Sequence, residues 1–349
     1  MISYRYCARY EQSYKTDMAG SNLSRSLSDP YGYVSYFSSP FYRSRWQGLR
    51  GLSNYGLSCC VNALLQSFSA TQELLALLNK WKVDDYVALE EANNAPLQLQ
   101  KALQAMQSDK FKPDPHQRFL RCLDRNRIHL NVQHDADEVF LSILNLIQEQ
   151  MSDKELAREI KSLYMVNVEE YLQCNECTYV DSGSTYLLSL PLPLCRDNNT
   201  LEECFRAFFE LQDLSNGNKC FCEKCGEKNP SKQGLKLISL PPVVCVHLKR
   251  FRSSRGYTKK LHCKVSFPQT IDFKTTLKPE QVSEKSEQSQ SEWQYKLYAV
   301  IVHCGTAMFG HYTAYIRHDG KNIWYHADDS HVSEVRWADV EGTFGGDKG

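Results

Sequence analysis

Apolar residues recur every three or four positions in the first half of the chain, and this spacing is typical of helices that bury one face. The strongest stripe lies in residues 135–151, where Asp135, Asp137 and Glu138 stand in the first turn, beside the positive end of the helix dipole. The pattern predicts helices over residues 95–106, 135–151, 154–164 and 201–211, and one more that begins at the cysteine pair of residues 59–60.

The second half of the chain consists of short runs rich in β-branched and aromatic residues, separated by Gly, Pro and Asp. Such runs are typical of strands, and helices followed by antiparallel strands favour an α+β fold over alternating βαβ units. The predicted strands cover residues 166–174, 186–192, 235–240, 243–251, 264–267, 295–303, 311–317 and 322–326.

Two segments lack both periodicities. Residues 1–46 are rich in Ser and Tyr and poor in aliphatic residues, so we expect a disordered N-terminal tail that precedes one domain over 47–349. Residues 278–292 consist mainly of charged residues, Gln and Ser, and are expected to form a solvated loop inside that domain.

Charge and hydropathy exclude several classes of protein. The 349 residues contain 41 Lys and Arg and 41 Asp and Glu, so no global positive field attracts nucleic acid; the one basic run, 249–260, is interpreted as a strand end and a loop. No stretch approaches the ~18 apolar residues of a membrane span, and the N-terminus lacks the features of a secretory signal. We therefore expect no membrane insertion and a location in the cytoplasm, with the nucleus as a further compartment.

Fourteen cysteines in a reducing compartment indicate metal ligation and thiol chemistry rather than disulfides. Two C-x-x-C pairs each present two thiolates from one tight turn, and two such turns complete a closed structural zinc site with no catalytic position. The alternatives are separate buried or redox cysteines, or Cys220 as a replacement ligand. The predicted ligands are Cys174, Cys177, Cys222 and Cys225.

A thiol nucleophile is predicted where a glycine-containing loop, residues 51–58, enters a helix at Cys59 and Cys60. Unpaired amides and the positive dipole end at a helix N-terminus stabilise a thiolate. His311 begins one predicted strand and Asp328 follows the next, so the two side chains can meet across a hairpin as the base and its orienting acid.

The segments GLSNYGLSCCVNALLQ, VQHDADEVF, LPPVVCVHLKRF, FGHYTAYI and WYHADD, together with the two C-x-x-C pairs, resemble the ordered motifs of the ubiquitin-specific proteases. The resemblance spans residues 48–337. It implies a papain-like cysteine protease with a helical thumb, an antiparallel palm, and zinc-bearing fingers at about residues 165–235. It also implies one structural zinc and no catalytic cofactor.

Carried over residue by residue, the resemblance implies a set of catalytic roles. Cys59 would be the nucleophile, although the Cys-Cys doublet departs from the family pattern and leaves Cys60 as an alternative. Asn54 would donate to the oxyanion, and His311 would be the general base and acid. Asp328 would orient the imidazole, with Asp329 as a second polar contact.

The same resemblance implies a narrow channel for a modifier tail that ends Arg-Gly-Gly. An acidic lining would bind the arginine, since carboxylates pair well with guanidinium groups. For Asp135 the alternative is a helix N-cap, and the two roles are compatible. The residues matched to tail binding are Gln133, Asp135, Glu138, His303 and Tyr312.

Within the family, the Ser-Cys-Cys doublet, residues 132–136, residues 225–237 and residues 329–332 look most like the interferon-induced branch. That branch removes a two-lobed, interferon-stimulated ubiquitin-like modifier from lysines of conjugated proteins and damps interferon signalling. The implied partners are the modifier, its conjugates and components of interferon-receptor signalling. A general deubiquitinase and a weakly active modifier-binding scaffold are the alternatives.

Three departures from the family pattern bear on activity. Leu57 replaces a polar residue in the nucleophile loop, and Ala327 replaces an aromatic residue before the acid. Residues 343–349 also lack the apolar, aromatic strand with which the family closes its palm. We therefore expect either a truncated form or a sheet with an unpaired edge, and reduced stability beside His311 and Asp328.

Overall fold

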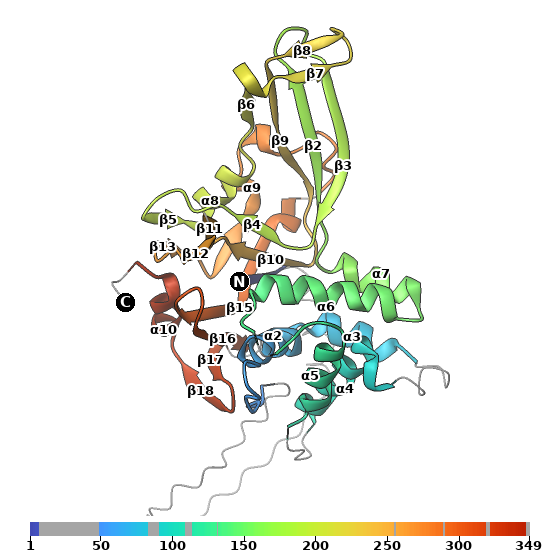
Figure 1. The fold of residues 1–349 in the computed structure, drawn as a ribbon, viewed down its shortest axis with the longest axis vertical. Helices are drawn as coiled ribbons and strands as arrows, with labels where there is room; N and C mark the ends of the chain where they lie inside the picture. Colours follow the sequence, from blue (N-terminus) through green and yellow to red (C-terminus); the bar gives the residue numbers. More distant parts are fainter. Residues whose placement is uncertain are drawn as a thin grey trace, which may run out of the picture.

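The computed structural model describes residues 1–6, 49–82, 91–108, 114–130, 132–254, 256–288, 290–318 and 322–346. A group of helices lies against one face of a central sheet, and a long, narrow set of strands projects away from both (Figure 1). This is the α+β arrangement that the sequence predicted. Within these ranges no helix combines the length and the apolar character needed to cross a membrane.

The helical part has a shared apolar core, and its central helix is buried along its whole length. All twelve residues of α2 (Cys59–Ala70) are buried, while each of its neighbours also has exposed residues. Asn94, Asp135 and Asp153 cap three of the helices through side-chain oxygens that accept backbone N–H groups. The others are α3 (Gln72–Lys80), α4 (Ala95–Gln107), α5 (Gln117–Arg125), α6 (Ala136–Gln150) and α7 (Lys154–Ser162).

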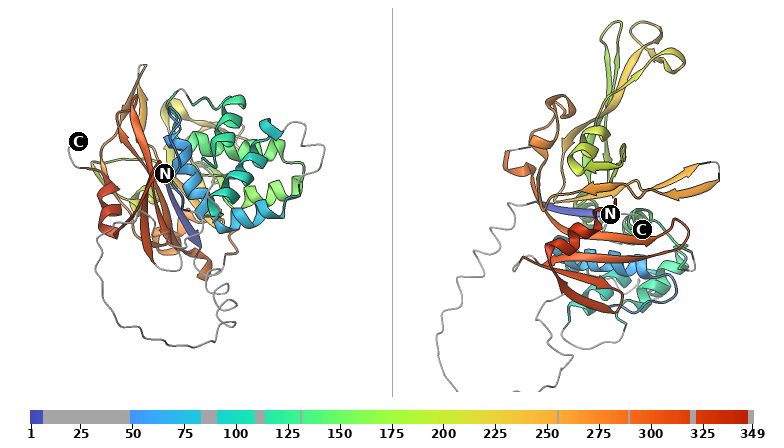
Figure 2. Two further views of the ribbon diagram at one scale, coloured as in Figure 1. Left: turned by 90° about the horizontal axis from the view of Figure 1, so that it is seen from below. Right: turned by 90° about the vertical axis from the view of Figure 1, so that its left-hand side faces the viewer.

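The central sheet runs in the order β18-β17-β16-β15-β1-β10-β4, with β14 paired to β15. The helices cover one face of this sheet, as the view from below shows (Figure 2). Its other face packs against a second apolar core. The strands are β1 (Ile2–Tyr6), β4 (Leu190–Leu192), β10 (Val243–Leu248), β14 (Thr270–Asp272), β15 (Gln294–Gly305), β16 (Gly310–His318), β17 (Ile323–Asp328) and β18 (His331–Val335).

The first strand corrects the prediction of a disordered tail over residues 1–46. Residues Ile2–Tyr6 pair with β10 on one side and β15 on the other, both antiparallel, at the centre of the sheet. Ile2 and Tyr4 enter the second core, which is why so short an apolar signal suffices to order the segment. The rest of the predicted tail, residues 7–46, lies outside the described residues.

Beyond β18, the described residues form α10 (Trp337–Glu341) and a 3-10 turn (Gly342–Phe344) but no strand. The sheet is nevertheless continuous from β18 to β4, because β1 lies between β15 and β10. At one end of this order, β18 pairs with β17 and is an edge strand of the described sheet, so the predicted unpaired edge beside His311 and Asp328 is not contradicted and the predicted loss of stability stays a prediction.

The projecting part is a four-stranded sheet of order β3-β2-β9-β6 with a two-stranded hairpin, β7 and β8, at its far end (Figure 1). Its position agrees with the fingers region predicted at about residues 165–235. The bounds are β2 (Val166–Cys174), β3 (Val180–Leu187), β6 (Gln212–Leu214), β7 (Cys220–Cys222), β8 (Glu227–Asn229) and β9 (Ser231–Ser239).

The segment 278–292 is not simply a solvated loop. Gln281 and Ser283 are buried, and the Ser283 hydroxyl donates to the Glu169 carboxylate of the fingers at 2.6 Å. Its polar composition therefore serves hydrogen bonds at the base of the fingers. The remaining described elements are β5 (Asn198–Thr200), α8 (Leu201–Phe208), β11 (Phe251–Ser254), β12 (Tyr257–Lys260), β13 (Lys264–Ser266), α9 (Phe273–Thr276), and the 3-10 turns Asn216–Asn218, Pro279–Gln281 and Gln290–Trp293.

Candidate active site and metal cluster

Cys59 is the first residue of α2, as the sequence predicted, and α2 packs against β16. Burial nevertheless raises the pKa of the Cys59 thiol, and the Tyr312 backbone N–H directed at the sulfur offsets only part of that rise. The backbone N–H groups of Cys59 and Cys60 at the helix start also lower this pKa, as expected for a helix N-terminus, but burial is the largest cause and the net shift is upward. Deprotonation requires a base at the site.

Cys60, the alternative nucleophile, faces the other way. Its thiol is fully enclosed in the protein, and this burial raises its pKa well above the ordinary value. Cys59 and Asp135 are among the groups that surround it, and solvent does not reach it. Because a nucleophilic thiol must be both deprotonated and reachable, these surroundings favour Cys59. The choice between the two cysteines stays a prediction.

His311 and Asp328 meet across the β16–β17 hairpin. The His311 Nε2 and the Asp328 Oδ1 are 2.6 Å apart, so the carboxylate accepts the Nε2–H and leaves Nδ1 free to take a proton. The Tyr312 N–H that points at Cys59 belongs to the next residue of the same strand. The structure thus brings together the predicted base, its orienting acid and the segment that touches the thiol.

Asp329 is the polar centre that connects this hairpin to the nucleophile loop. Its Oδ2 accepts a hydrogen bond from the Asn54 amide at 2.8 Å, and its Oδ1 accepts one from the Asn62 amide of α2 at 2.7 Å. The Asn54 Nδ2 carries two hydrogens, so the second remains available for an oxyanion. Asp329 therefore holds the predicted oxyanion donor in place, a larger role than a secondary polar contact.

Backbone contacts press the same loop against the turn that follows β17. The Leu52 N–H donates to the Asp329 carbonyl at 2.8 Å, and a Cβ atom at Gly51 would lie 2.1 Å from the Ser330 carbonyl oxygen. Only glycine allows so close an approach between the two backbones. The loop position is therefore fixed by glycine as well as by Asp329.

A cavity of about 890 Å³, including its open mouth, lies between α6 and the strands β10, β15 and β16. Three residues predicted to bind the modifier tail, Asp135, His303 and Tyr312, line it. The Gln133 amide lies 3.1 Å from the His303 Nε2, and burial lowers the pKa of His303 to about 4, so this imidazole is neutral. Glu138 is exposed and does not line the cavity.

His247 also lines this cavity, and it was not among the residues predicted to bind the tail. Its Nε2 lies 3.2 Å from the Asp135 Oδ2, and its Nδ1 lies 3.2 Å from the Asp137 Oδ2. Burial lowers the pKa of His247, but the two carboxylates outweigh burial and raise it to about 9. Asp135 is at the same time the N-cap of α6, accepting the Asp137 N–H at 2.8 Å, so both roles foreseen for it are compatible.

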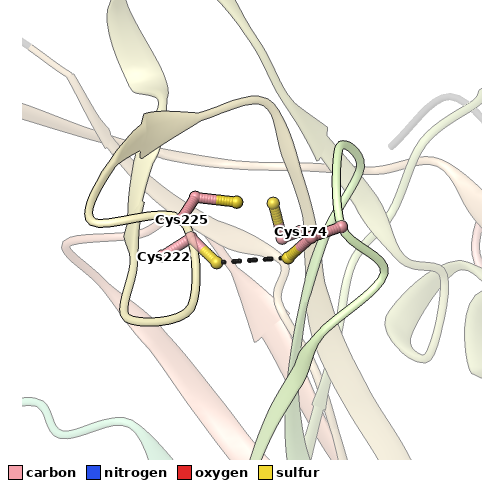
Figure 3. A group of neighbouring side chains, drawn as sticks. Cys174, Cys222 and Cys225 are labelled. Carbon is pink, nitrogen blue, oxygen red and sulfur yellow. Dashed lines mark hydrogen bonds between the residues drawn. The ribbon is translucent and has the colours of Figure 1, made fainter.

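The four predicted ligand cysteines come together at the far end of the fingers. Their sulfur atoms lie within 4.8 Å of one another, and Figure 3 shows those of Cys174, Cys222 and Cys225 converging. The Cys177 backbone N–H lowers the pKa of Cys174 to about 7, whereas a hydrogen bond to Cys177 raises the pKa of Cys225 to about 12. Four thiolates so close together need a cation to balance their charge, and the cluster can hold a metal ion.

The competing ligand, Cys220, is not part of that cluster. Its sulfur makes a 4.0 Å contact with the Asn218 carbonyl, and the group of four does not include it. The geometry agrees with the C-x-x-C pairs as the metal-binding unit.

A buried cysteine at a helix start, a histidine held by an aspartate, an asparagine amide beside them and a neighbouring cavity define a thiol hydrolase. The sequence matches the family model described as "Ubiquitin carboxyl-terminal hydrolase" over residues 50–344. The chain belongs to this family, and it is a cysteine isopeptidase.

Individual relatives agree with this assignment. The chain is 39% identical to mouse "Ubl carboxyl-terminal hydrolase 18" and 37% identical to the human protein of that name, in each case over 85% of this chain and 81% of the relative. Its fold is similar to a chain in "Structure of the SAGA Ubp8/Sgf11/Sus1/Sgf73 DUB module bound to ubiquitin aldehyde". That match has a TM-score of 0.72 and 20% identity, and it covers 87% of this chain and 69% of that chain.

Replacing Asp329 tests the role of the polar centre. Asp329→Ala should lower kcat by ~100-fold with KM within ~3-fold, because the oxyanion donor loses its anchor while the tail cavity is untouched. Steady-state kinetics on a fluorogenic modifier substrate would measure this. Asp181→Ala, which removes an exposed carboxylate of β3, is the control. A kcat that stays within ~2-fold of wild type would contradict the anchoring role.

The His247 cluster predicts a pH dependence of stability. Its folded pKa of about 9 lies above the ordinary value of 6.5, so the stabilisation is complete below pH 6.5 and is lost as the pH rises through 9. The loss should amount to about 3 kcal/mol of unfolding free energy. Urea unfolding of wild type and His247→Gln between pH 6 and 10 measures it.

In that experiment the difference in unfolding free energy between wild type and His247→Gln should become smaller as the pH rises above 9. His129→Gln, which removes an exposed His–Asp pair, is the matched control and should leave the pH dependence unchanged. A gap between wild type and His247→Gln that stays constant with pH would refute the charged state of His247.

Proposed function

We propose that this chain removes a ubiquitin-like modifier, the two-lobed interferon-stimulated one, from lysines of conjugated proteins. The observation that carries the choice of modifier is the 39% and 37% identity to the two hydrolases named for ubiquitin-like proteins, which extends over most of both chains. A general deubiquitinase is the second candidate, and the ubiquitin aldehyde bound in a structural relative favours it.

The site geometry supports a two-step thiol mechanism. The His311 Nδ1 takes the proton of Cys59, and the sulfur attacks the carbonyl carbon of the modifier's last residue. The free Asn54 N–H donates to the developing oxyanion, and His311 then returns the proton to the leaving lysine amine. Water attacks the resulting thioester in the same way and restores the thiol. Asp328 keeps the imidazole oriented throughout.

The cavity supports recognition of a tail that carries arginine. Asp135 lines it, and His247 holds Asp135 and Asp137 in place through opposite charge. The three groups carry a net charge of −1 when His247 is protonated. Arg250 and Lys260 also line the cavity, so the support for binding a guanidinium group is the local Asp135 carboxylate and not the charge of the cavity as a whole. Glu138, being exposed, would act only at the rim.

We assign zinc to the metal cluster of the fingers. Four thiolates and no open coordination position are the donor set of structural zinc, so the metal would stabilise the fingers rather than take part in catalysis. Cys174, Cys177, Cys222 and Cys225 would supply the ligands. When bound, the ion supplies the positive charge that four adjacent thiolates require.

The biological setting follows from the same proposal. A hydrolase for an interferon-stimulated modifier would damp interferon signalling, and its partners would be the modifier, its conjugates and components of interferon-receptor signalling. Such substrates would place it in the cytoplasm, with the nucleus as a second location.

Covalent labelling tests the nucleophile and the modifier together. The two-lobed modifier and ubiquitin, each with a C-terminal electrophile, are incubated with wild type, Cys59→Ala and Cys60→Ala, and adducts are read by intact mass. We expect an adduct with the two-lobed probe alone, lost in Cys59→Ala and kept in Cys60→Ala.

Each other outcome of the labelling experiment has a definite meaning. Labelling by both probes would support the general deubiquitinase. If the adduct were lost in Cys60→Ala and kept in Cys59→Ala, Cys60 would be the nucleophile. A folded protein that neither probe labels would be a modifier-binding scaffold rather than an enzyme.

Metal content tests the zinc assignment. Native mass spectrometry should show one zinc per chain, and Cys225→Ser should lose it and unfold at a lower temperature. Cys220→Ser is the matched control, because its sulfur lies outside the cluster, and it should keep the metal. A chain that folds with the same midpoint after the metal is removed would show that the cluster is not structural.

A further inference from the structure

A buried arginine joins the central strand of the palm to the helix of the nucleophile. Arg5 lies on β1 with its side chain only 4% exposed. Its Nη2 donates to the carbonyl of Ala70, the last residue of α2. The carbonyls of a last helical turn have no partner within the helix, and a cation there also complements the negative end of the dipole.

Two further contacts fix the Arg5 guanidinium. Its Nε lies 3.4 Å from the Glu73 carboxylate in the first turn of α3. Its central carbon lies 4.6 Å from the ring centroid of Tyr298 on β15, within the range of a cation–π contact. The Tyr298 hydroxyl in turn lies 2.9 Å from the Thr71 hydroxyl, which follows α2. One side chain therefore connects β1, β15, α2 and α3.

The two faces of β1 have separate tasks. Ser3 and Arg5 point toward the helices, where the Ser3 hydroxyl lies 3.7 Å from the sulfur of Cys245. Ile2 and Tyr4 enter the core on the opposite face, where the Tyr4 hydroxyl donates to the Pro268 carbonyl at 2.8 Å. Changes at Tyr4 and Arg5 can therefore separate the strand's packing from its hold on α2.

The position of the Ala70 end of α2 affects the active site because the helix moves as a unit and carries the Cys59 thiol at its other end. Twelve residues span ~18 Å, and all of them are buried, most of them in apolar packing that is non-directional. Directional contacts hold the helix at three places. Asn62 donates to Asp329 near the start, and Gln66 donates to the Arg50 carbonyl at 2.6 Å further along. Arg5 donates to the Ala70 carbonyl at the end, and this contact ties that end of the helix to the central sheet. A small tilt at the Ala70 end would displace Cys59 from His311, and a misplacement of ~1 Å can cost ~100-fold in rate.

We propose that Arg5 is a positioning residue for the isopeptidase reaction. By holding the C-terminal end of α2, it sets the distance and angle at which the Cys59 thiol meets the His311 imidazole. This inference rests on the thiol mechanism above, but it concerns a side chain at the opposite end of the helix from the reacting atoms.

The experiment uses the full chain and separates rate from binding and from stability. Arg5→Met, Arg5→Lys and Tyr4→Phe are assayed on C-terminal coumarin amides of the two-lobed modifier and of ubiquitin, well below each unfolding midpoint. We expect Arg5→Met to lower kcat by ~10- to 100-fold with KM within ~3-fold, and Arg5→Lys to recover part of the loss. Tyr4→Phe should lower the midpoint without changing kcat.

A double variant separates the loss of the Arg5 contacts from the cost of an unpaired charge at Glu73. Arg5→Met leaves the Glu73 carboxylate without its cationic partner. The double variant Arg5→Met/Glu73→Met removes both charges and is measured as well. If Arg5→Met does not fold, the kcat of the double variant tests the inference instead. An unchanged kcat in the folded double variant would overturn the inference.

The rate of Cys59 alkylation by iodoacetamide gives a readout that needs no modifier. If wild type turns over neither substrate, the proposed function fails. A change in alkylation rate in Arg5→Met would then still support the positioning role, and an unchanged rate would refute it.

Discussion

The chemistry of this protein depends on how the buried helix α2 is held against the sheet. The thiol lies on the helix and the imidazole on β16, so no local sequence feature fixes their separation. Apolar packing brings the two surfaces together, but it is non-directional and permits sliding. Hydrogen bonds supply direction. Asp329 accepts from Asn54 and Asn62 at the start of the helix, Gln66 donates to the Arg50 carbonyl, and Arg5 donates to the last carbonyl of the helix. The geometry of the active site is therefore set at the interface between the helices (the thumb) and the central sheet (the palm).

The same interface accounts for the state of the nucleophile. A thiol enclosed between helix and sheet is shielded from water, and this raises its pKa although the helix dipole favours the thiolate. The free enzyme then holds Cys59 mainly as a thiol. In the proposed mechanism, proton transfer to His311 is therefore part of the reaction, and activity would depend strongly on the alignment of these two side chains. This coupling explains why so many polar contacts converge on a helix that apolar burial alone would hold in place.

Sequence patterns predicted well those features that depend on neighbours along the chain. The helix stripe at residues 135–151, the strand over 166–174 and the meeting of His311 with Asp328 each follow from short-range periodicity or a single hairpin. The four-cysteine cluster was predictable across a long insertion, because each C-x-x-C is a local unit with one chemical use. Features that join distant segments were not predictable. The short strand β1 has too few apolar residues to signal order, and the contacts that stabilise it are all with distant segments: its two neighbours in the sheet, the second core and the end of α2.

His247 shows the same limit within the site. It lies on a buried strand, where packing is the ordinary role of a histidine, and its two carboxylate partners begin a helix more than 100 residues earlier. Only the tertiary contact raises its pKa to about 9 and makes it a cation in the channel. Asp135 also caps α6. The Asp135 carboxylate at the cavity is therefore held both by the start of helix α6 and by His247 on strand β10. If the modifier tail binds at this carboxylate, as proposed, it acts on the same interface between the helices and the central sheet that holds Cys59 near His311, so tail recognition and alignment of the nucleophile would depend on one set of contacts.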